Sequence, residues 1–234
     1  MLLNVSLPVL NEEKDLAKNV PVLMEFLKRW NEIPYEVVIA DNGSTDQTAE
    51  VARRLAQEHA PHLRVLQLRE RGRGRAVKRA WTESRADIVS YMDIDLSADL
   101  ECFPMLIHPL LKGTCDLAVG SRLHKDSQTT RGLKREILSK GYNTLTKLLL
   151  GAQFSDAQCG FKALSRKAAD VLLPLVKDDE WFFDTEMLVI AARRGLRIQD
   201  VPIRWVDDPD TRVKVWSTMV KDLKGLARLW RDKG

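Results

Sequence analysis

The order of strand-like and helix-like segments constrains the fold of this chain more than any other feature. Apolar, β-branched runs are separated by longer segments whose apolar residues recur at helical spacing. The expected strands are Leu2–Val9, Tyr35–Asp41, Leu63–Leu68, Ile88–Asp93 and Leu117–Ser121, and the expected helices between them are Glu12–Arg29, Thr45–Ala60, Gly74–Ser84 and Leu100–Leu111. This alternation predicts an α/β fold, with one mostly parallel central sheet and helices on both of its faces.

The second half of the chain departs from this regular alternation. The apolar spacing predicts one long helix over Arg131–Leu150, a short segment around Cys159–Leu164, helices near Ser165–Leu175 and Thr185–Arg194, and a strand near Arg197–Trp205. We interpret residues 1–216 as one domain on a single sheet, with a nucleotide-binding half (1–122) and a substrate-shaping half (123–216).

Residues 217–234 are expected to form a basic amphipathic helix. Its apolar residues share one face and its basic residues lie largely elsewhere, the former being Met219, Val220, Leu223, Leu226, Ala227 and Trp230, and the latter Lys221, Lys224, Arg228 and Arg231. Two interpretations stay open: a helix that lies in the headgroup layer of a membrane, and a helix that packs on the domain with a solvated outer face.

The composition is that of a soluble globular protein, with 44% apolar and 30% charged residues. No stretch approaches the roughly 18 uninterrupted apolar residues of a transmembrane helix. The three cysteines, Cys102, Cys115 and Cys159, are odd in number and form no CxxC pair, which favours a reduced, cytosolic compartment. The net charge of +4 permits an anionic partner without identifying one.

Asp93 and Asp95 stand at the end of the fourth expected strand, at positions i and i+2. Open α/β sheets bind their ligands at the C-terminal ends of the strands. Hard divalent cations such as Mg²⁺ take carboxylate oxygens and keep positions free for substrate phosphates. The pair therefore indicates a metal-bridged diphosphate, the alternative being two solvated surface acids.

Polar residues also follow the first two expected strands. Pro8, Asn11 and Glu12 come at the end of the first strand, and Asp41 opens the run Asp-Asn-Gly-Ser-Thr-Asp at the end of the second. This run is typical of a turn with a helix N-cap. A carboxylate at the strand tip also has the chemistry to accept hydrogen bonds from a base or a ribose.

The basic loop Arg69–Arg75, with the sequence Arg-Glu-Arg-Gly-Arg-Gly-Arg, leads into an expected helix. Glycines at a helix N-terminus let backbone N–H groups approach a phosphate, and arginine adds bidentate contacts. The loop is neither a Walker A motif nor GxGxxG, so a P-loop or NAD site is not supported. An RNA-binding patch is the competing interpretation, but the loop lacks interleaved aromatic residues.

Further motifs lie at the end of the first half and in the second half. Gly-Ser-Arg122 closes the fifth strand, and Arg135, Ser139 and Lys140 are expected to share part of one face of the long helix, where the alternatives are an anionic acceptor site and a solvated helix end. Two other motifs mix polar and aromatic residues: Asp-Ala-Gln-Cys-Gly-Phe-Lys (156–162) and Trp-Phe-Phe-Asp-Thr-Glu (181–186). Aromatic runs are more often core than site, yet buried acids need partners.

In this order the motifs resemble those of the family 2 glycosyltransferases with the GT-A fold, and most closely those of the polyprenyl-phosphate (dolichyl-phosphate) glucosyl- and mannosyltransferases. The resemblance runs from Pro-Val-Leu-Asn-Glu (8–12) to Trp-Val-Asp-Asp-Pro-Asp-Thr-Arg-Val (205–213). It rests on the ordered set of Asp-Asn-Gly-Ser-Thr-Asp (41–46), Gly-Arg-Gly-Arg-Ala (72–76), Asp-Ile-Asp-Leu-Ser (93–97), Gly-Ser-Arg (120–122) and the two mixed motifs, which look more like the glucosyl branch.

The resemblance implies a role for each matching residue. The nucleotide would be bordered by Pro8, Asn11, Glu12, Asp41, Arg73, Asp93 and Arg212, and the metal would be held by Asp95. The acceptor phosphate would be held by Arg122, Arg135 and Ser139, and the sugar would lie near Gln158, Asp184 and Glu186. Asp93, Asp95, Asp184 and Glu186 are thus the expected catalytic residues, while Ser97 stands where some relatives carry glutamine.

The implied reaction is a metal-dependent, inverting transfer of a hexose, glucose rather than mannose, from a nucleotide-sugar to a polyprenyl phosphate. The implied cofactor is Mg²⁺ or Mn²⁺, and the donor is UDP-glucose in preference to GDP-mannose. A lipid-linked acceptor places the protein at the cytoplasmic face of a membrane as a peripheral protein, with no nucleic-acid partner. The alternatives are a transferase with a hydroxyl acceptor, for which Asp184 or Glu186 would be the base, and a non-catalytic sugar- or nucleic-acid-binding module.

Overall fold

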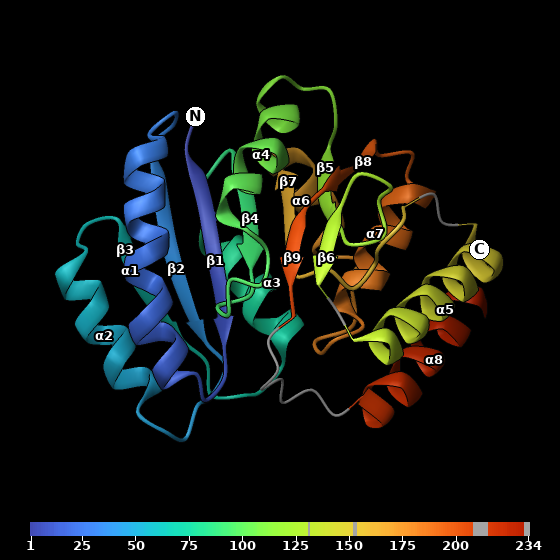
Figure 1. Cartoon of the computed structure of the whole chain (residues 1–234), viewed down its shortest axis with the longest axis horizontal. Helices are drawn as coiled ribbons and strands as arrows, with labels where there is room; N and C mark the ends of the chain where they lie inside the picture. Colours follow the sequence, from blue (N-terminus) through green and yellow to red (C-terminus); the bar gives the residue numbers. More distant parts are fainter. Residues whose placement is uncertain (131, 152–153, 208–214, 232–234) are drawn as a thin grey trace.

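The computed structural model describes residues 1–130, 132–151, 154–207 and 215–231, which form an α/β structure around a seven-stranded sheet (Figure 1). The strand order is β3-β2-β1-β4-β7-β5-β8. The strands are β1 (Leu3–Val9), β2 (Tyr35–Asp41), β3 (Leu63–Gln67), β4 (Ile88–Met92), β5 (Leu117–Ser121), β7 (Phe161–Ser165) and β8 (Ile198–Pro202). A second, two-stranded sheet consists of β6 (Gln128–Thr130) and β9 (Arg204–Val206).

The helices alternate with these strands as expected in the first half. They are α1 (Glu13–Trp30), α2 (Thr48–Glu58), α3 (Arg73–Glu83), α4 (Phe103–Leu111, after a 3₁₀ turn at Leu100–Cys102), α5 (Leu133–Leu150), α6 (Arg166–Leu172), α7 (Phe183–Arg193) and α8 (Val215–Arg231). The expected α/β class with a mostly parallel sheet is confirmed, because five of the ladders in the two sheets are parallel: β1 with β2, β1 with β4, β2 with β3, β5 with β8, and β6 with β9.

The short segment expected around residues 159–164 is a central strand. β7 runs antiparallel to both β4 and β5 and lies between them. A strand from the second half therefore completes the sheet of the first half. The proposed division at residue 122 stays a prediction, but the two halves share one sheet.

The single strand expected near Arg197–Trp205 is wrong in one respect, because two strands stand there. β8 pairs with β5 up to the Ser121–Pro202 position, and β9 pairs with β6 in the second sheet. Proline has no N–H group to extend a ladder, so Pro202 suits the end of a strand. The next residue, Ile203, donates its N–H to Ser127 Oγ instead (3.0 Å).

Apolar side chains cover both faces of the sheet, as expected for strands buried on both sides. Ile88 and Met92 of β4 pack in the cluster beneath α1 and α4, whereas Val89 and Tyr91 pack in the cluster beneath α3 and α7. Because successive residues of one strand point to opposite faces, β4 contributes to both halves of the core. This burial fixes the position of the Asp93–Asp95 segment that follows it.

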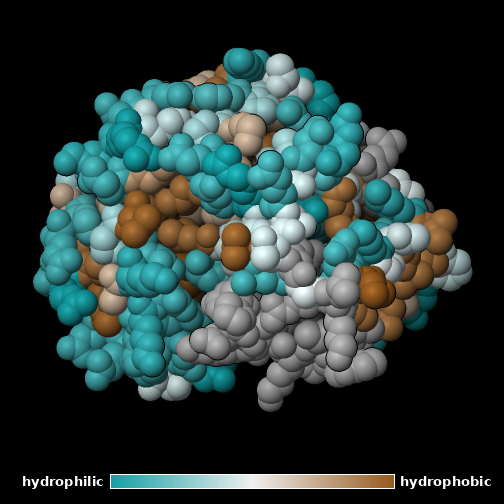
Figure 2. All heavy atoms as spheres, in the orientation of Figure 1, coloured by the Kyte–Doolittle hydropathy of each residue, from teal (hydrophilic) through white to brown (hydrophobic). Residues whose placement is uncertain are grey.

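The last helix packs against the domain next to α5, as expected by one of the two interpretations (Figure 1). Leu226 and Leu229 are buried, and a Cβ added at Gly225 would lie 2.5 Å from the Phe182 ring, so the helix sits close to the core. Leu223 and Trp230 of the same helix remain exposed, and hydrophobic atoms (brown) are visible at this end of the molecule in Figure 2. No helix within the described ranges is long and apolar enough to cross a membrane.

Candidate active site

The residues expected to border a nucleoside meet at the ends of β1 and β2. Asn11 N–H donates to Ser44 Oγ (2.9 Å), and Asn11 Oδ1 accepts from Thr45 N–H (2.7 Å). Glu12 N–H donates to Thr48 Oγ1 (2.8 Å), so the two turns are tied together. The φ angle of Asn11 is 58°, a left-handed conformation that asparagine tolerates better than most residues.

Asp41 supports this edge of the sheet as a turn residue. It is 3% exposed, and its Oδ1 accepts from Ser44 N–H (3.0 Å). The turn expected at this motif is therefore present, but the N-cap of α2 is Gln47, whose side chain makes no capping hydrogen bond. Pro8 lies within β1 beside it and is half-buried. Contacts of Pro8 and Asp41 with a nucleoside stay a prediction.

The basic loop does not present its backbone to a phosphate in the way the glycines suggested. Gly72 N–H donates to Asn42 Oδ1 (2.7 Å), Gly74 N–H to the Glu180 carbonyl (3.2 Å) and Arg75 N–H to the Asp179 carbonyl (3.0 Å). A Cβ at Gly74 would lie 2.5 Å from Phe183 Cβ, so this glycine permits close packing of α3 against α7. The prediction of a phosphate cradle from these three N–H groups is wrong, because the 179–180 segment already occupies two of them.

Arg73 turns inward from this loop and joins two acids of the site. It is 9% exposed, and its guanidinium contacts Asp93 Oδ1 (Nη2, 2.6 Å) and Asp184 Oδ2 (Nη1, 2.7 Å). The rings of Tyr91 and Trp181 lie 5.0 and 4.9 Å from its central carbon. The structure thus brings Arg73, Asp93 and Asp184 together, and the approach of Arg73 to a diphosphate stays a prediction.

Asp184 is surrounded by positive charge. It is 2% exposed, and its second oxygen, Oδ1, contacts Lys162 Nζ (2.9 Å) and accepts a short hydrogen bond from the Tyr91 hydroxyl. Burial by itself would raise the pKa of Asp184, but Lys162 and Arg73 outweigh that effect and lower the pKa below its ordinary value. Both oxygens are engaged and the carboxylate is stabilised in its ionised form, which makes Asp184 a poor proton acceptor.

Glu186 lies two residues farther along α7, and its hydrogen bonds point elsewhere. Its Oε2 accepts from Lys177 N–H (3.1 Å) and Asp178 N–H (2.7 Å), and its Oε1 contacts Arg228 Nη2 of α8 (3.0 Å). These contacts join the 177–178 segment to the last helix. The structure does not bring Glu186 into the group formed by Arg73, Asp93 and Asp184, so its predicted place near a sugar has no geometric support.

The two strand-end acids border one small hollow. Asp93, Asp95, Gly160 and Trp205 are among its lining residues. Asp93 N–H donates to the Gly160 carbonyl (3.1 Å), and Asp95 Oδ1 accepts from Ser97 N–H (2.9 Å). A Cβ at position 160 would stand 1.8 Å from Asp93 Oδ2, so only glycine leaves room for this carboxylate. The expected pairing of Asp93 and Asp95 is therefore formed.

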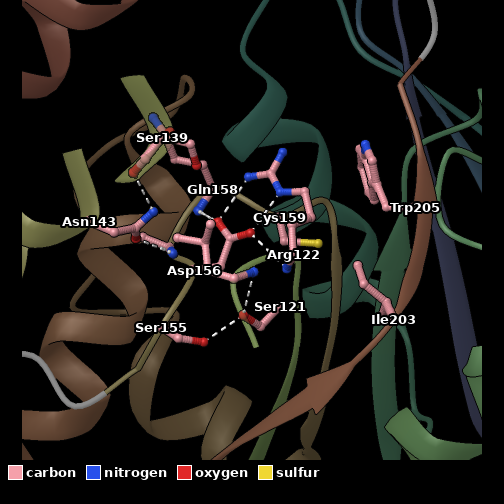
Figure 3. A network of polar contacts seen from close by, with 12 residues as sticks. Ser121, Arg122, Ser139, Asn143, Ser155, Asp156, Gln158, Cys159, Ile203 and Trp205 are labelled. Atoms are coloured by element: carbon pink, nitrogen blue, oxygen red, sulfur yellow. Dashed lines mark hydrogen bonds and ion pairs between the residues drawn. The ribbon is translucent and has the colours of Figure 1, made fainter. Parts of the chain in front are cut away.

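A buried acid holds Arg122 in place (Figure 3). Asp156, which is fully buried, accepts from Arg122 Nε (2.7 Å), Nη2 (2.9 Å) and the backbone N–H (3.1 Å). The Trp205 ring lies 5.1 Å from the guanidinium carbon. Although burial opposes a charged guanidinium, Asp156 raises the pKa of Arg122 above its ordinary value. A bidentate pair of this kind fixes the orientation of an arginine that is expected to meet a phosphate.

The remaining acceptor-side predictions have mixed outcomes. Ser139 is 6% exposed and faces inward, whereas Lys140 is exposed and pairs with Glu136 (2.6 Å), so these two residues do not share a face. The backbone of Arg135 belongs to α5, but its side chain lies outside the described structure, as does the whole of Arg212. Gln158 is exposed, and its Nε2 donates to Asp222 Oδ2 of α8 (3.0 Å).

Three residues of this site carried no predicted role. Asp156 and Lys162 stand in a motif that the sequence singled out, and a lysine inside the apolar run Phe-Lys-Ala-Leu (161–164) was a signal for a buried acid partner. Asp222 gave no such signal, because an acid in a basic amphipathic helix is expected to be solvated. Its burial depends on how α8 packs.

The fold and these strand-end groups define an α/β protein whose polar groups gather at the carboxyl ends of the sheet strands, where open α/β sheets bind their ligands. The chain belongs to glycosyl transferase family 2, whose family model matches residues 5–173. The predicted resemblance and the predicted glycosyltransferase enzyme are thereby confirmed.

Curated relatives agree with this family. The chain is 38% identical over 227 residues to glycosyltransferase AglD of Haloferax volcanii, covering 95% of this chain but only 35% of that protein. It is 33% identical over 256 residues to the dolichyl-phosphate beta-glucosyltransferase of Mus musculus, covering 99% of this chain and 78% of the relative. The chain thus spans about a third of the archaeal relative and most of the mouse one.

Solved structures support the fold. Glucosyl-3-phosphoglycerate synthase from Mycobacterium tuberculosis, crystallised with Mn²⁺, UDP and glucosyl-3-phosphoglycerate, superimposes with a TM-score of 0.73 at 20% identity, covering 98% of this chain and 79% of that one. Crystals of the same enzyme with Mg²⁺ and UDP give a TM-score of 0.72 at 19% identity, covering 98% of this chain and 79% of that one. At this level of identity the match shows the GT-A fold alone.

Proposed function

We propose that this chain is a metal-dependent, inverting glycosyltransferase that moves glucose from UDP-glucose to a polyprenyl phosphate. The state of Asp184 carries the proposal. Both of its oxygens are bound by cationic or hydroxyl groups, so the acid best placed to act as a base near Asp93 is not free to do so. An acceptor that is already an anion needs no such base, and a lipid phosphate meets that condition.

The residues of the hollow fit a divalent cation. Asp93 and Asp95 offer hard carboxylate oxygens on one wall, and Gly160 leaves the space that the Asp93 carboxylate needs. Among the residues that the structure describes, no three His, Cys, Asp or Glu side chains gather as a ligand set. One or two carboxylates supplemented by diphosphate oxygens are a usual set for Mg²⁺. When bound, such a cation supplies positive charge that stabilises the leaving diphosphate.

The protein side chains contribute orientation and charge. In an in-line displacement the acceptor phosphate must approach the anomeric carbon from the side opposite the leaving diphosphate. Arg122, held by Asp156, supplies a preoriented cation for that phosphate, and Arg73 holds Asp93 and Asp184 at a fixed separation. Catalysis by this arrangement rests on positioning and on neutralising charge as it develops.

Glucose and a lipid acceptor are favoured by the relatives. The mouse relative is named a dolichyl-phosphate beta-glucosyltransferase, and so are relatives from Dictyostelium discoideum and Drosophila melanogaster. Exposed apolar residues on α5 and α8 are consistent with a membrane surface near the acceptor side, namely Ile137, Leu138, Leu148, Leu223 and Trp230. We therefore propose peripheral association with the cytoplasmic face of a membrane.

A donor and acceptor panel tests the proposed function. Release of UDP from UDP-glucose and of GDP from GDP-mannose is measured with Mn²⁺ or Mg²⁺, alone, with a short polyprenyl phosphate, and with the matching polyprenol that lacks the phosphate. We expect UDP-glucose turnover that the polyprenyl phosphate stimulates and the polyprenol does not. Equal stimulation by the polyprenol would favour the hydroxyl-acceptor alternative, and a failure to bind either nucleotide-sugar would overturn the enzyme proposal.

Gly160→Ala is expected to lower Mn²⁺-dependent UDP binding and transfer by about a hundredfold, because misplacing a site group by about 1 Å costs about that much. The added Cβ would meet Asp93 Oδ2 at 1.8 Å, so the carboxylate must leave its position. Calorimetric titration of UDP with and without Mn²⁺ measures the binding. Gly141→Ala is the matched control, since a Cβ there meets nothing within 4 Å. Unchanged UDP binding in Gly160→Ala would mean that Mn²⁺-dependent nucleotide binding does not depend on the position of the Asp93 carboxylate.

A further inference from the structure

Asp222 is a buried acid of the last helix that has one unused oxygen. It is 2% exposed, and its Oδ2 accepts from Gln158 Nε2 (3.0 Å). Its Oδ1 is enclosed and has no hydrogen-bond partner among the described residues. A buried carboxyl oxygen without a partner is costly, and such groups in native structures call for an explanation such as an absent ligand.

The charged groups around Asp222 do not neutralise the negative charge of its ionised form. Asp178 and Asp184 both repel ionised Asp222, and the pKa of Tyr142 of α5 is raised mainly by burial and further by Asp222. The neighbouring cations are committed to other acids: Lys162 and Arg73 pair with Asp184, and Arg228 pairs with Glu186. Mainly because of burial, the pKa of Asp222 is raised to about 7, although the hydrogen bond from Gln158 opposes the shift.

Gln158 links this acid to the rest of the site. Its backbone N–H donates to Asp156 Oδ1 (3.2 Å), so it lies on the same loop as the acid that holds Arg122. Two residues farther along, Gly160 adjoins Asp93. Since Nε2 of Gln158 is directed to Asp222, the amide oxygen Oε1 is the atom left for another partner.

We propose that Asp222 is a positioning residue of the sugar site, which orients the Gln158 amide so that Oε1 accepts a hydrogen bond from a sugar hydroxyl. The inference rests on the proposed function, and it assigns the recognition of the hexose hydroxyls in part to the C-terminal helix. A neutral carboxylic acid accepts the hydrogen bond from Gln158 without adding a charge, whereas the ionised form adds an uncompensated charge beside Asp178 and Asp184.

The test compares the donor with the same nucleotide lacking the sugar. In Asp222→Leu we expect UDP-glucose affinity to fall about tenfold and UDP affinity to stay within twofold of wild type, both measured by calorimetry with Mn²⁺, since one lost hydrogen bond to a ligand corresponds to about that factor. Gln158→Leu is expected to give the same loss, and the double variant no further loss, because the two side chains act as one unit. Asp170→Asn, an exposed acid of α6, is the matched control.

The pH dependence of the KM for UDP-glucose distinguishes this positioning role from a purely structural one, which would leave the pH dependence unchanged. For wild type, the KM for UDP-glucose is expected to rise several-fold as the pH rises through about 7, because Asp222 then ionises. Asp222→Asn cannot ionise, so its KM is expected to stay at the low-pH value throughout. An unchanged ratio of UDP-glucose to UDP affinity in folded Asp222→Leu, as judged by circular dichroism, would overturn the inference while leaving the proposed function intact. Wild type that binds no nucleotide-sugar would instead overturn both.

Discussion

Asp95→Ala is expected to lower sugar transfer by about a thousandfold, more than the loss of any single acid near the sugar. Removing a group that stabilises charge on a leaving group typically costs about a hundredfold to a thousandfold in rate, and the loss of a metal ligand also weakens substrate binding. Asp95 borders the hollow beside Asp93, and its Oδ1 accepts a hydrogen bond from Ser97 N–H (2.9 Å). Initial rates of UDP release with saturating Mn²⁺ measure the effect.

The interpretation of Asp95 depends on two comparisons. Glu58→Ala removes an exposed acid of α2 that pairs with Arg54, and transfer is expected to remain at the wild-type rate. We also expect the transfer rate of Asp95→Ala to depend less strongly on the Mn²⁺ concentration than the wild-type rate does, in addition to being lower. Titration of Mn²⁺ against the nucleotide complex of this variant measures that dependence. An Asp95→Ala enzyme that retained a tenth or more of its activity with an unchanged Mn²⁺ dependence would contradict a metal role for this carboxylate.

Arg73→Met is expected to destabilise the protein by about 3–5 kcal/mol and to abolish most transfer. Removing one partner of a buried ion pair leaves an uncompensated charge, which is the costly case. Here the arginine is 9% exposed and is the shared partner of Asp93 and Asp184, so both acids lose a cation at once. Asp184 would keep Lys162, but Asp93 would keep no other ion pair among those described. Denaturant unfolding followed by circular dichroism gives the free energy of unfolding.

A matched surface variant and a double variant distinguish charge pairing from lost packing. Arg54→Met breaks an exposed pair with Glu58 and is expected to cost less than about 1 kcal/mol. Arg73→Met/Asp184→Asn removes a charge of each sign, and we expect it to recover part of the stability lost in Arg73→Met, because neighbouring charges are not additive. The opposite result would be a double variant that is less stable than Arg73→Met by the full cost of an independent Asp184→Asn substitution. In that case the main contribution of Arg73 to stability would be its packing between Tyr91 and Trp181.

The strand-end groups were predictable because strand positions translate directly into space. Parallel strands deliver their carboxyl ends to one edge, so Asn11, Asp41 and Asp93 had to fall near each other once the alternation was recognised. The hydrogen bonds that join the Asn11 and Ser44–Thr45 turns bear this out. The same reasoning failed for the backbone of the 72–75 loop, because it took no account of Asn42, which accepts from Gly72 N–H, or of the 179–180 segment, which accepts from Gly74 and Arg75 N–H.

Local periodicity and contiguous motifs were enough to predict the α/β class, the order of most strands and helices, the family, and the position of the Asp93–Asp95 pair. Tertiary structure alone decided that β7 enters the sheet antiparallel, that Asp156 holds Arg122, that Arg73 joins Asp93 to Asp184, and that Asp222 of α8 meets Gln158. These contacts link residues from 20 to 111 positions apart. Local patterns cannot specify them, because which buried charges meet depends on how the helices pack against the sheet.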